Sequence, residues 1–372
     1  MKNENRSNGF KRIVKITSII LAAAIIIPII TMFAGRGINA VRFNIAHGVQ
    51  ERYFITLGGI EQKIHIRGEN TNNPVIIWLH GGPGWSCAYE LAVWQYQMES
   101  DFTFIRWDQR GSGRTYRRSP AAPLSLEILI ADLDELVDYA IERFDQPVFI
   151  VGNSWGSLLG ITYASLHPER IAGFVGVGQD IDQQKSLRIA LQTAYERATA
   201  VGNIEDAQQI WAVYEVIRDK TFIGDDLISD YIVLAQHLPA PYLAPRYESQ
   251  APGIVFSPWF GFYELRELIS VFFIDNNLFA NRNRTLFYEI YVFTPPERLE
   301  VPVAFIMGSE DFITNTGLVV EYYNRVEALS KSLFLIEGSG HAPQNSQPGV
   351  FAEMLSEALQ GFDIGRDIDE KL

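Results

Sequence analysis

Residues 148–167 read VFIVGNSWGSLLGITYASLH, and this stretch joins three patterns. Val148–Val151 is a short, wholly apolar run, which is typical of a strand buried on both faces. Leu158–His167 has the pattern of a helix. Between them lies Gly152–Gly156 (GNSWG), a G-x-S-x-G sequence in the strand–turn–helix context of a nucleophile elbow. Such a turn would expose the hydroxyl of Ser154 at the carboxyl end of a sheet, beside a helix N-terminus whose partial positive charge favours an anion.

Strand and helix patterns alternate along most of the chain. Further buried strands are predicted at Val75–Leu79, Phe102–Trp107, Ile171–Val177, Val303–Met307 and Leu333–Ile336. Phe54–Leu57 and Ile64–Ile66 flank Gly58-Gly59, which predicts a hairpin. Leu124–Phe144 has helical spacing, with Ser125 as its N-cap. The alternation predicts an α/β fold with a mostly parallel sheet that helices cover on both faces.

The alternation is interrupted between residues 178 and 302. This segment is helical in pattern and rich in aromatic residues and proline, as in PAPYLAPRY and FSPWFGFYEL. Because a strand pattern resumes at Val303, the simplest interpretation is a helical cap inserted between two strands of one sheet. The predicted division assigns 41–179 and 301–372 to the core and 180–300 to the cap. An independent second domain is the alternative.

Composition excludes several classes of protein. The 372 residues hold 31 Lys and Arg against 44 Asp and Glu, a net charge of −13, which disfavours broad binding to nucleic acids. The single cysteine, Cys87, can form neither an internal disulfide nor a thiolate metal site alone. The sequence contains no HExxH motif, no His/Asp cluster at ligand spacing and no P-loop, so neither a metal nor a cofactor is expected.

The first forty residues predict a basic N-terminus and a membrane anchor. Ile16–Ala34 carries no charge, and nineteen residues at about 1.5 Å each span roughly 28 Å, close to the hydrocarbon core of a bilayer. The basic residues before this run are Lys2, Arg6, Lys11, Arg12 and Lys15. Since positive residues stay in the cytoplasm, we expect a single-pass protein with its N-terminus inside and the bulk of the chain outside. The alternative is a signal peptide and a secreted protein, although Ile38–Ala40 is a poor cleavage site.

A serine hydroxyl needs a base to take its proton, and His341 is the best placed of the six histidines. It lies in a loop, GSGHAP, just after the predicted strand at Leu333–Ile336, from which it could reach Ser154 across the end of the sheet. Asp311 follows the preceding strand in GSED and is the expected carboxylate partner of His341. The neighbouring Glu310 should then point away.

Two backbone N–H groups are expected to stabilise a negatively charged oxygen at this site. One is that of Trp155, directly after the serine. The other is that of Gly82 in the loop His80–Gly84 (HGGPG), because Pro83 has no N–H. We expect His80 to brace this loop by hydrogen bonding rather than to act as a base.

These motifs together resemble the α/β-hydrolase superfamily, and within it the proline iminopeptidase group of serine peptidases. The resemblance depends on HGGPG at 80–84, WDQRGSGR at 107–114 and GNSWGS at 152–157, and it covers roughly 53–186 and 302–362. It implies an α/β-hydrolase fold, a triad of Ser154, Asp311 and His341, and an oxyanion hole at Gly82 and Trp155. The resemblance also implies that the loop 108–113 shapes the active site.

The expected function is therefore hydrolysis through an acyl-enzyme, with aminopeptidase activity on short peptides as the first hypothesis. The cap's glutamates match no amine-binding motif of the group, so the residues that bind the substrate stay unassigned: Glu196, Glu205, Glu215, Glu248, Glu264, Glu267 and Glu289. A carboxylesterase with the same triad is the alternative, in which Trp259, Phe260 and Phe262 would line an acyl pocket. A non-enzymatic binding protein is disfavoured because no triad member is missing.

Overall fold

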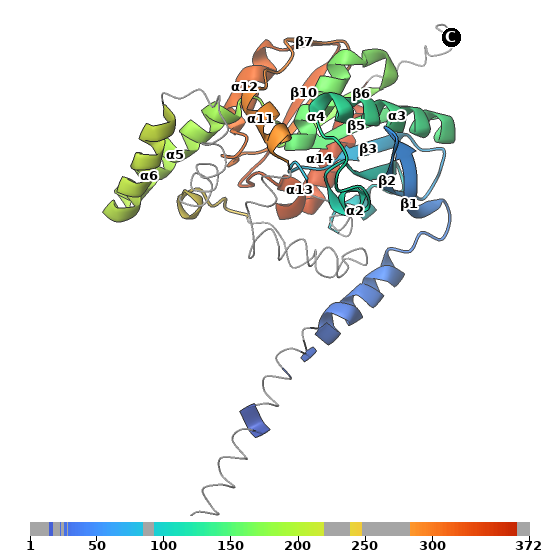
Figure 1. Ribbon diagram of the computed structural model, residues 1–372, viewed down its shortest axis with the longest axis horizontal. Coiled ribbons are helices and arrows are strands. Elements are labelled where there is room, and N and C mark those ends of the chain that lie inside the picture. Colours follow the sequence, from blue (N-terminus) through green and yellow to red (C-terminus); the bar gives the residue numbers. More distant parts are fainter. Residues whose placement is uncertain are drawn as a thin grey trace, which may run out of the picture.

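A computed structural model describes residues 15–17, 23, 26–27, 29–84, 93–218, 239–247 and 283–362. Eight strands form one sheet in the order β1-β2-β4-β3-β5-β6-β8-β10 (Figure 1). The pairs β1–β2 and β2–β4 are antiparallel, and every later pair is parallel. The bounds of these strands are β1 Val49–Leu57, β2 Ile60–Gly68, β3 Val75–Leu79, β4 Thr103–Asp108, β5 Val148–Asn153, β6 Gly173–Val177, β8 Val303–Gly308 and β10 Lys331–Ile336. The predicted mostly parallel sheet is confirmed.

Small differences separate the predicted strands from the observed ones. The strand expected from Ile171 begins at Gly173, because Ile171 is the C-cap of a 3-10 helix, η3 (Pro168–Arg170). The last strand begins earlier than expected, at Lys331, because β10 lies at the sheet's edge, where polar side chains can face solvent while the backbone still pairs with β8. The predicted hairpin is present, and Gly58 and Gly59 both have positive φ, as its two-residue turn requires.

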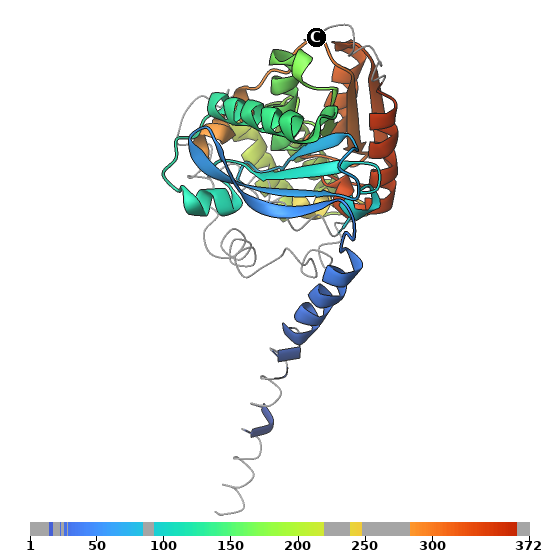
Figure 2. The same cartoon turned by 90° about the vertical axis from the view of Figure 1, so that its right-hand side faces the viewer.

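Helices cover both faces of the sheet (Figures 1 and 2). The apolar residues of β3 alternate, so that Val75, Ile77 and Leu79 pack in one core and Ile76 and Trp78 in the other. The first core includes side chains of α3 (Leu126–Phe144), α4 (Trp155–Leu166), α11 (Arg284–Val292) and α12 (Thr316–Arg325), and the second those of α14 (Pro348–Gln360). Ser125 caps α3 as predicted, because its side chain accepts a hydrogen bond from the Ile128 N–H.

Short elements complete the described part of the chain. They are η2 (Gln95–Gln97), α2 (Gly113–Arg118), α13 (Pro343–Ser346) and the two-stranded pair of β7 (Arg298–Leu299) and β9 (Glu327–Ala328). Both α2 and α13 lie near carboxyl ends of strands, since α2 follows β4 and α13 follows the loop after β10.

The segment between β6 and β8 is helical where it is described. It contains α5 (Gln183–Ala200), α6 (Ile204–Arg218), the 3-10 turn η4 (Ala240–Tyr242) and α11. In Figure 1, α5 and α6 extend away from the sheet as a pair. Their facing apolar residues form a small core of their own, which includes Leu191, Ala194 and Ile210. The division of the chain into core and cap stays a prediction.

Residues 29–42 form a helix that projects from the body of the molecule (Figures 1 and 2). Where this helix ends, the Phe43 carbonyl accepts a 2.7 Å hydrogen bond from Arg67, which is itself paired with Glu99 in the interior. Among the residues that the structure describes, no helix is both long enough and apolar enough to cross a bilayer. Part of the predicted span, Ile16–Ala34, lies outside those residues.

Candidate active site

The turn between β5 and α4 places Ser154 in an unusual backbone conformation. Its φ is 53° and its ψ −122°, a combination that is strained for a residue with a side chain. Close packing supports the turn, since a Cβ on Gly156 would lie 2.2 Å from the Leu79 carbonyl oxygen. A Cβ on Gly152 would likewise lie 2.2 Å from the carbonyl oxygen of Gly156. Both glycines of the motif are therefore needed for strand and helix to approach this closely.

The structure brings together the three side chains that the sequence predicts for the triad. His341 Nε2 lies 2.9 Å from Ser154 Oγ, and His341 Nδ1 lies 2.9 Å from Asp311 Oδ2. Ser154 follows β5, Asp311 follows β8 and His341 follows β10, so all three lie at the carboxyl edge of the parallel strands. Glu310 contacts a different partner, because its Oε2 accepts a 2.7 Å bond from the Arg246 N–H.

Thr314 holds Asp311 in place, a role that sequence reasoning missed. Its hydroxyl donates to Asp311 Oδ2 at 2.9 Å, and the N–H groups of Ile313 and Thr314 donate to Oδ1 at 2.8 and 3.1 Å. The Thr314 hydroxyl also lies 3.2 Å from His341 Nδ1. The signal was present in the sequence as Asp-x-x-Thr, a spacing at which side chain and backbone commonly hydrogen-bond in a turn.

The loop after β6 completes the surroundings of His341 and was also missed. A Cβ on Gly178, whose φ is +53°, would lie 3.0 Å from the His341 carbonyl oxygen and 3.3 Å from its ring. Asp180, two residues further on, is 3% exposed, and its Oδ1 has no hydrogen-bond partner in the described part of the chain. The Asp180 N–H donates to Ser157 Oγ at 3.0 Å, which ties this loop to α4.

Three buried titratable groups are coupled at this site. Burial alone would raise the pKa of Asp311, but His341 and the hydrogen bonds from Thr314 lower it. Burial alone would lower the pKa of His341, but the carboxylates of Asp311 and Asp180 raise it. Burial raises the pKa of Asp180 to about 7, against the attraction of His341. Negative charge from Asp311, and from Asp180 where it is ionised, therefore favours an imidazolium at His341.

The loop His80–Gly84 passes directly against Ser154. A Cβ on Gly81 would lie 3.3 Å from the Ser154 Cβ. Trp155 is the first residue of α4, where an N–H has no partner within the helix, and Gly82 has a φ of +125° that suits glycine. In the described ranges, neither N–H donates to a protein acceptor. Their predicted role as oxyanion donors stays a prediction.

His80 braces this loop as expected. Its Nδ1 lies 2.7 Å from the Gly81 carbonyl oxygen and its Nε2 2.9 Å from Ser112 Oγ, while the Gln109 N–H donates to Nε2 at 3.2 Å. Burial lowers the pKa of His80 to about 4, so the ring is neutral near pH 7. A ring engaged at both nitrogens is poorly suited to act as a base for Ser154.

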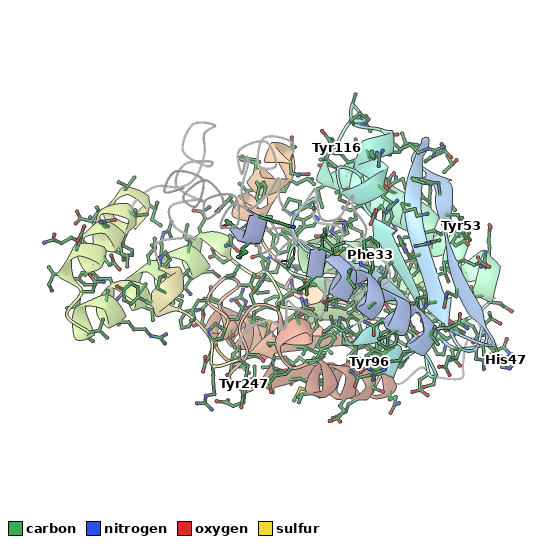
Figure 3. The ribbon with its side chains drawn as sticks, turned by 90° about the horizontal axis from the view of Figure 1, so that it is seen from below. Phe33, His47, Tyr53, Tyr96, Tyr116 and Tyr247 are labelled. Carbon is green, nitrogen blue, oxygen red and sulfur yellow. The ribbon has the colours of Figure 1, made fainter. Side chains whose placement is uncertain are left out.

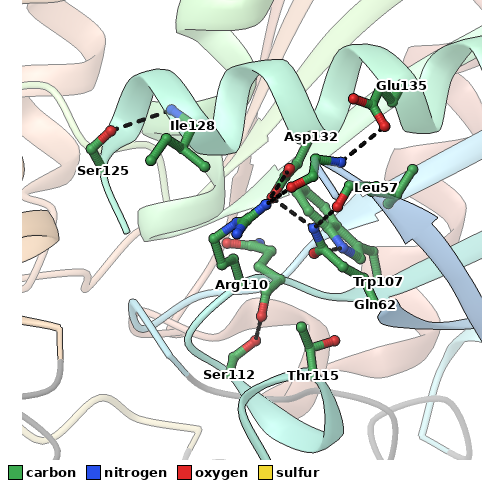
Figure 4. Close-up of polar contacts among 12 residues, drawn as sticks. Leu57, Gln62, Trp107, Arg110, Ser112, Thr115, Ser125, Ile128, Asp132 and Glu135 are labelled. Carbon is green, nitrogen blue, oxygen red and sulfur yellow. Dashed lines mark hydrogen bonds and ion pairs between the residues drawn. The ribbon is translucent and has the colours of Figure 1, made fainter. Parts of the chain in front are cut away.

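A buried ion pair joins the loop 108–113 to α3 (Figure 4). Arg110 Nε and Nη2 donate to the two oxygens of Asp132 on α3 at 2.8 and 2.9 Å. Gln62 of β2 donates to the same carboxylate at 2.7 Å and accepts from Trp107 Nε1 at 2.9 Å. This network joins the loop to the sheet and to α3, which favours a structural rather than a chemical role for it.

Comparison with known proteins identifies the family. Residues 76–354 match the family model described as the alpha/beta hydrolase family. The chain belongs to this family. A probable aminopeptidase, YbaC, of Bacillus subtilis is 27% identical to the hydrolase over 308 residues, which are 81% of this chain and 94% of that relative. A proline iminopeptidase of Neisseria gonorrhoeae is 34% identical over 118 residues, which cover only 30% of this chain and 36% of the relative.

Solved structures agree on the fold. The crystal structure of a membrane phospholipase A aligns with 96% of the hydrolase and 99% of its own chain, with a TM-score of 0.61 and 13% identity. The crystal structure of VinJ aligns with 84% of the hydrolase and 99% of its own chain, with a TM-score of 0.57 and 18% identity. Together with the sheet order, these likenesses confirm the α/β-hydrolase fold, and identities this low carry no further conclusion.

The other residues that sequence analysis singled out do not join the triad. Glu196, Glu205 and Glu215 are exposed on α5 and α6, and Glu289 is partly exposed on α11. Cys87, Glu248, Glu264, Glu267, Trp259, Phe260 and Phe262 lie outside the described residues. Within the residues that are described, no three His, Cys, Asp or Glu side chains of the hydrolase are grouped so that they could hold a metal ion.

Proposed function

We propose that this hydrolase is a serine hydrolase that works through an acyl-enzyme. The observation that carries the proposal is the pair of 2.9 Å contacts that join Ser154, His341 and Asp311. His341 Nε2 takes the hydroxyl proton as Ser154 Oγ bonds to the substrate's carbonyl carbon. The resulting imidazolium, stabilised by Asp311, then donates that proton to the leaving group as its bond to carbon breaks. Water, deprotonated by His341 in the same way, releases the acyl group and restores Ser154.

The N–H groups of Trp155 and Gly82 are proposed to stabilise the oxyanion. Both belong to segments that adjoin Ser154, and both lack a protein acceptor among the described residues. Donors held in place before the reaction stabilise the developing charge without reorganisation. Trp155 is fixed by its indole N–H, which donates to Gln109 Oε1 at 3.0 Å.

The substrates proposed first are short peptides with a free N-terminus. The similarity to a probable aminopeptidase over 94% of that relative, and to proline iminopeptidases over shorter stretches, supports this choice. A carboxylesterase with the same triad is the competing function. A panel of aminoacyl-arylamides and short acyl esters separates the two, because ester turnover without any arylamide cleavage would reject the peptidase.

Ser154→Ala tests the mechanism itself. Removal of the nucleophile of a comparable triad lowers kcat by about 10⁶, and we expect a loss of that order together with the loss of labelling by a fluorophosphonate. Ser165→Ala is the matched control, since Ser165 is exposed on the same helix, α4, and should retain both properties. Activity of Ser154→Ala near that of the wild type would overturn the assignment.

An N-terminal membrane anchor is proposed for residues 1–40. The support is the uncharged run Ile16–Ala34 behind a basic N-terminus. The projecting helix also exposes apolar side chains, among them Ile30 and Phe33 (Phe33 is labelled in Figure 3). Alkaline extraction of membranes tests the anchor, because an integral protein stays in the pellet. N-terminal sequencing of the mature protein decides between an anchor and a cleaved signal peptide.

A further inference from the structure

A cavity of about 350 Å³ lies beside His341, between the first helix of the β6–β8 segment and the loops that follow β8 and β10. Its wall is mostly apolar, with side chains that include Leu187, Ala190, Leu243, Pro245, Phe312 and Ile313. The volume falls in the range of small-molecule binding sites. The mechanism described above does not assign it.

The segment 239–247 forms one side of this cavity and is held against the loop that carries His341. The Tyr247 N–H donates to the Gly338 carbonyl oxygen at 2.9 Å, and the two segments form a parallel bridge between Tyr247 and Ser339 (Tyr247 is labelled in Figure 3). A Cβ on Gly340 would lie 3.0 Å from the Pro245 ring. The cavity wall is therefore positioned by the same loop that positions the imidazole.

The position of His341 on the wall indicates which part of a substrate the cavity receives. His341 lines the cavity, whereas Ser154, Gly82 and Trp155 do not. In acyl transfer the carbonyl oxygen faces the oxyanion donors, and the imidazolium faces the leaving group to which it gives its proton. We propose that this cavity binds the leaving group of the substrate and selects leaving groups that are apolar and carry no negative charge. This inference rests on the proposed serine mechanism.

The charges on the wall favour the same conclusion. Glu310 lines the cavity, and among the described lining residues there is no Lys or Arg. A carboxylate placed there, such as the C-terminus of a dipeptide, would lose its hydration without gaining a cationic partner. Peptide amides, longer peptides with an apolar second residue, and apolar esters are therefore the preferred substrates.

A series of esters with one acyl group measures this preference under either proposed activity. For alanine methyl, propyl and butyl esters, we expect kcat/KM to rise by up to about fourfold for each added methylene that the cavity buries. Ala244→Trp should flatten the series by filling the cavity, because Ala244 is an exposed lining residue. Ala240→Trp, at a second exposed lining position, is the substitute if Ala244→Trp does not fold.

The matched control is Ala200→Trp, which adds the same side chain at an exposed position outside the cavity and should leave the slope unchanged. If kcat/KM of the wild type does not change along the ester series, the inference is wrong. It is also wrong if a cavity-filling variant changes the preference for the acyl group, measured with alanine and leucine methyl esters, and not the preference for the leaving group. Fluorophosphonate labelling keeps the two proposals apart. A protein that is labelled at Ser154 but shows no slope refutes only the cavity assignment, and an unlabelled protein refutes the serine mechanism.

Discussion

Gly178→Ala should impair catalysis by displacing His341. At this glycine φ is +53°, so an alanine adds about 1–2 kcal/mol of backbone strain. Its methyl carbon would also lie 3.0 Å from the His341 carbonyl oxygen and 3.3 Å from ring atoms Cε1 and Nδ1. Contacts this tight require His341 to move by a few tenths of an ångström, which disturbs its 2.9 Å contacts with Ser154 and Asp311. Since a displacement of about 1 Å can cost 10²-fold in rate, we expect kcat to fall by about tenfold with little change in KM.

Gly202→Ala separates this effect from backbone strain. Gly202 also has a positive φ, +77°, but nothing lies within 4 Å of the position of its added Cβ. Both variants should lose about 1–2 kcal/mol of unfolding free energy in urea titrations. Only Gly178→Ala should lose activity, measured as initial rates on an aminoacyl-arylamide or an ester. Equal kcat values for the two variants would refute the claim that the loop after β6 positions the imidazole.

Three further variants test the electrostatics of the molecule. Asp180→Asn removes a carboxylate that raises the pKa of His341. The pKa of His341 should therefore fall, and the acidic limb of the kcat/KM–pH profile should move to lower pH. If the activity falls but the limb does not move, Asp180 has only a structural role. Asp132→Asn leaves the charge of Arg110 buried without its partner and should lower the unfolding free energy by about 3–5 kcal/mol. Glu61→Gln, which breaks an ion pair about half exposed on each side, should cost at most about 1 kcal/mol, and similar losses in the two variants would contradict this reasoning.

Much of the fold and of the candidate site could be predicted because the signals are local in the chain. Apolar runs of five or six residues identify strands buried on both faces, as at Val75–Leu79, whose predicted and observed bounds coincide. The G-x-S-x-G turn specifies its own geometry, because the two glycines meet the backbone of neighbouring segments at distances no side chain allows. His341 and Asp311 were found because residues that follow parallel strands converge at one edge of the sheet.

Tertiary structure alone decided what surrounds the imidazole. Asp180 and Gly178 belong to no recognisable sequence motif. They lie close to His341 because β6 and β8 are neighbours in the sheet, and the hydrophobic pattern of the sequence does not specify that strand order. The same holds for the cavity, whose wall joins α5, the segment 239–247 and two loops more than sixty residues further along the chain. The sequence by itself determined the chemistry-bearing residues and the alternation of elements, since both depend on neighbours in the chain. Side-chain burial, charge coupling and the shape of the binding space depend on neighbours in space, and only the folded sheet supplies them.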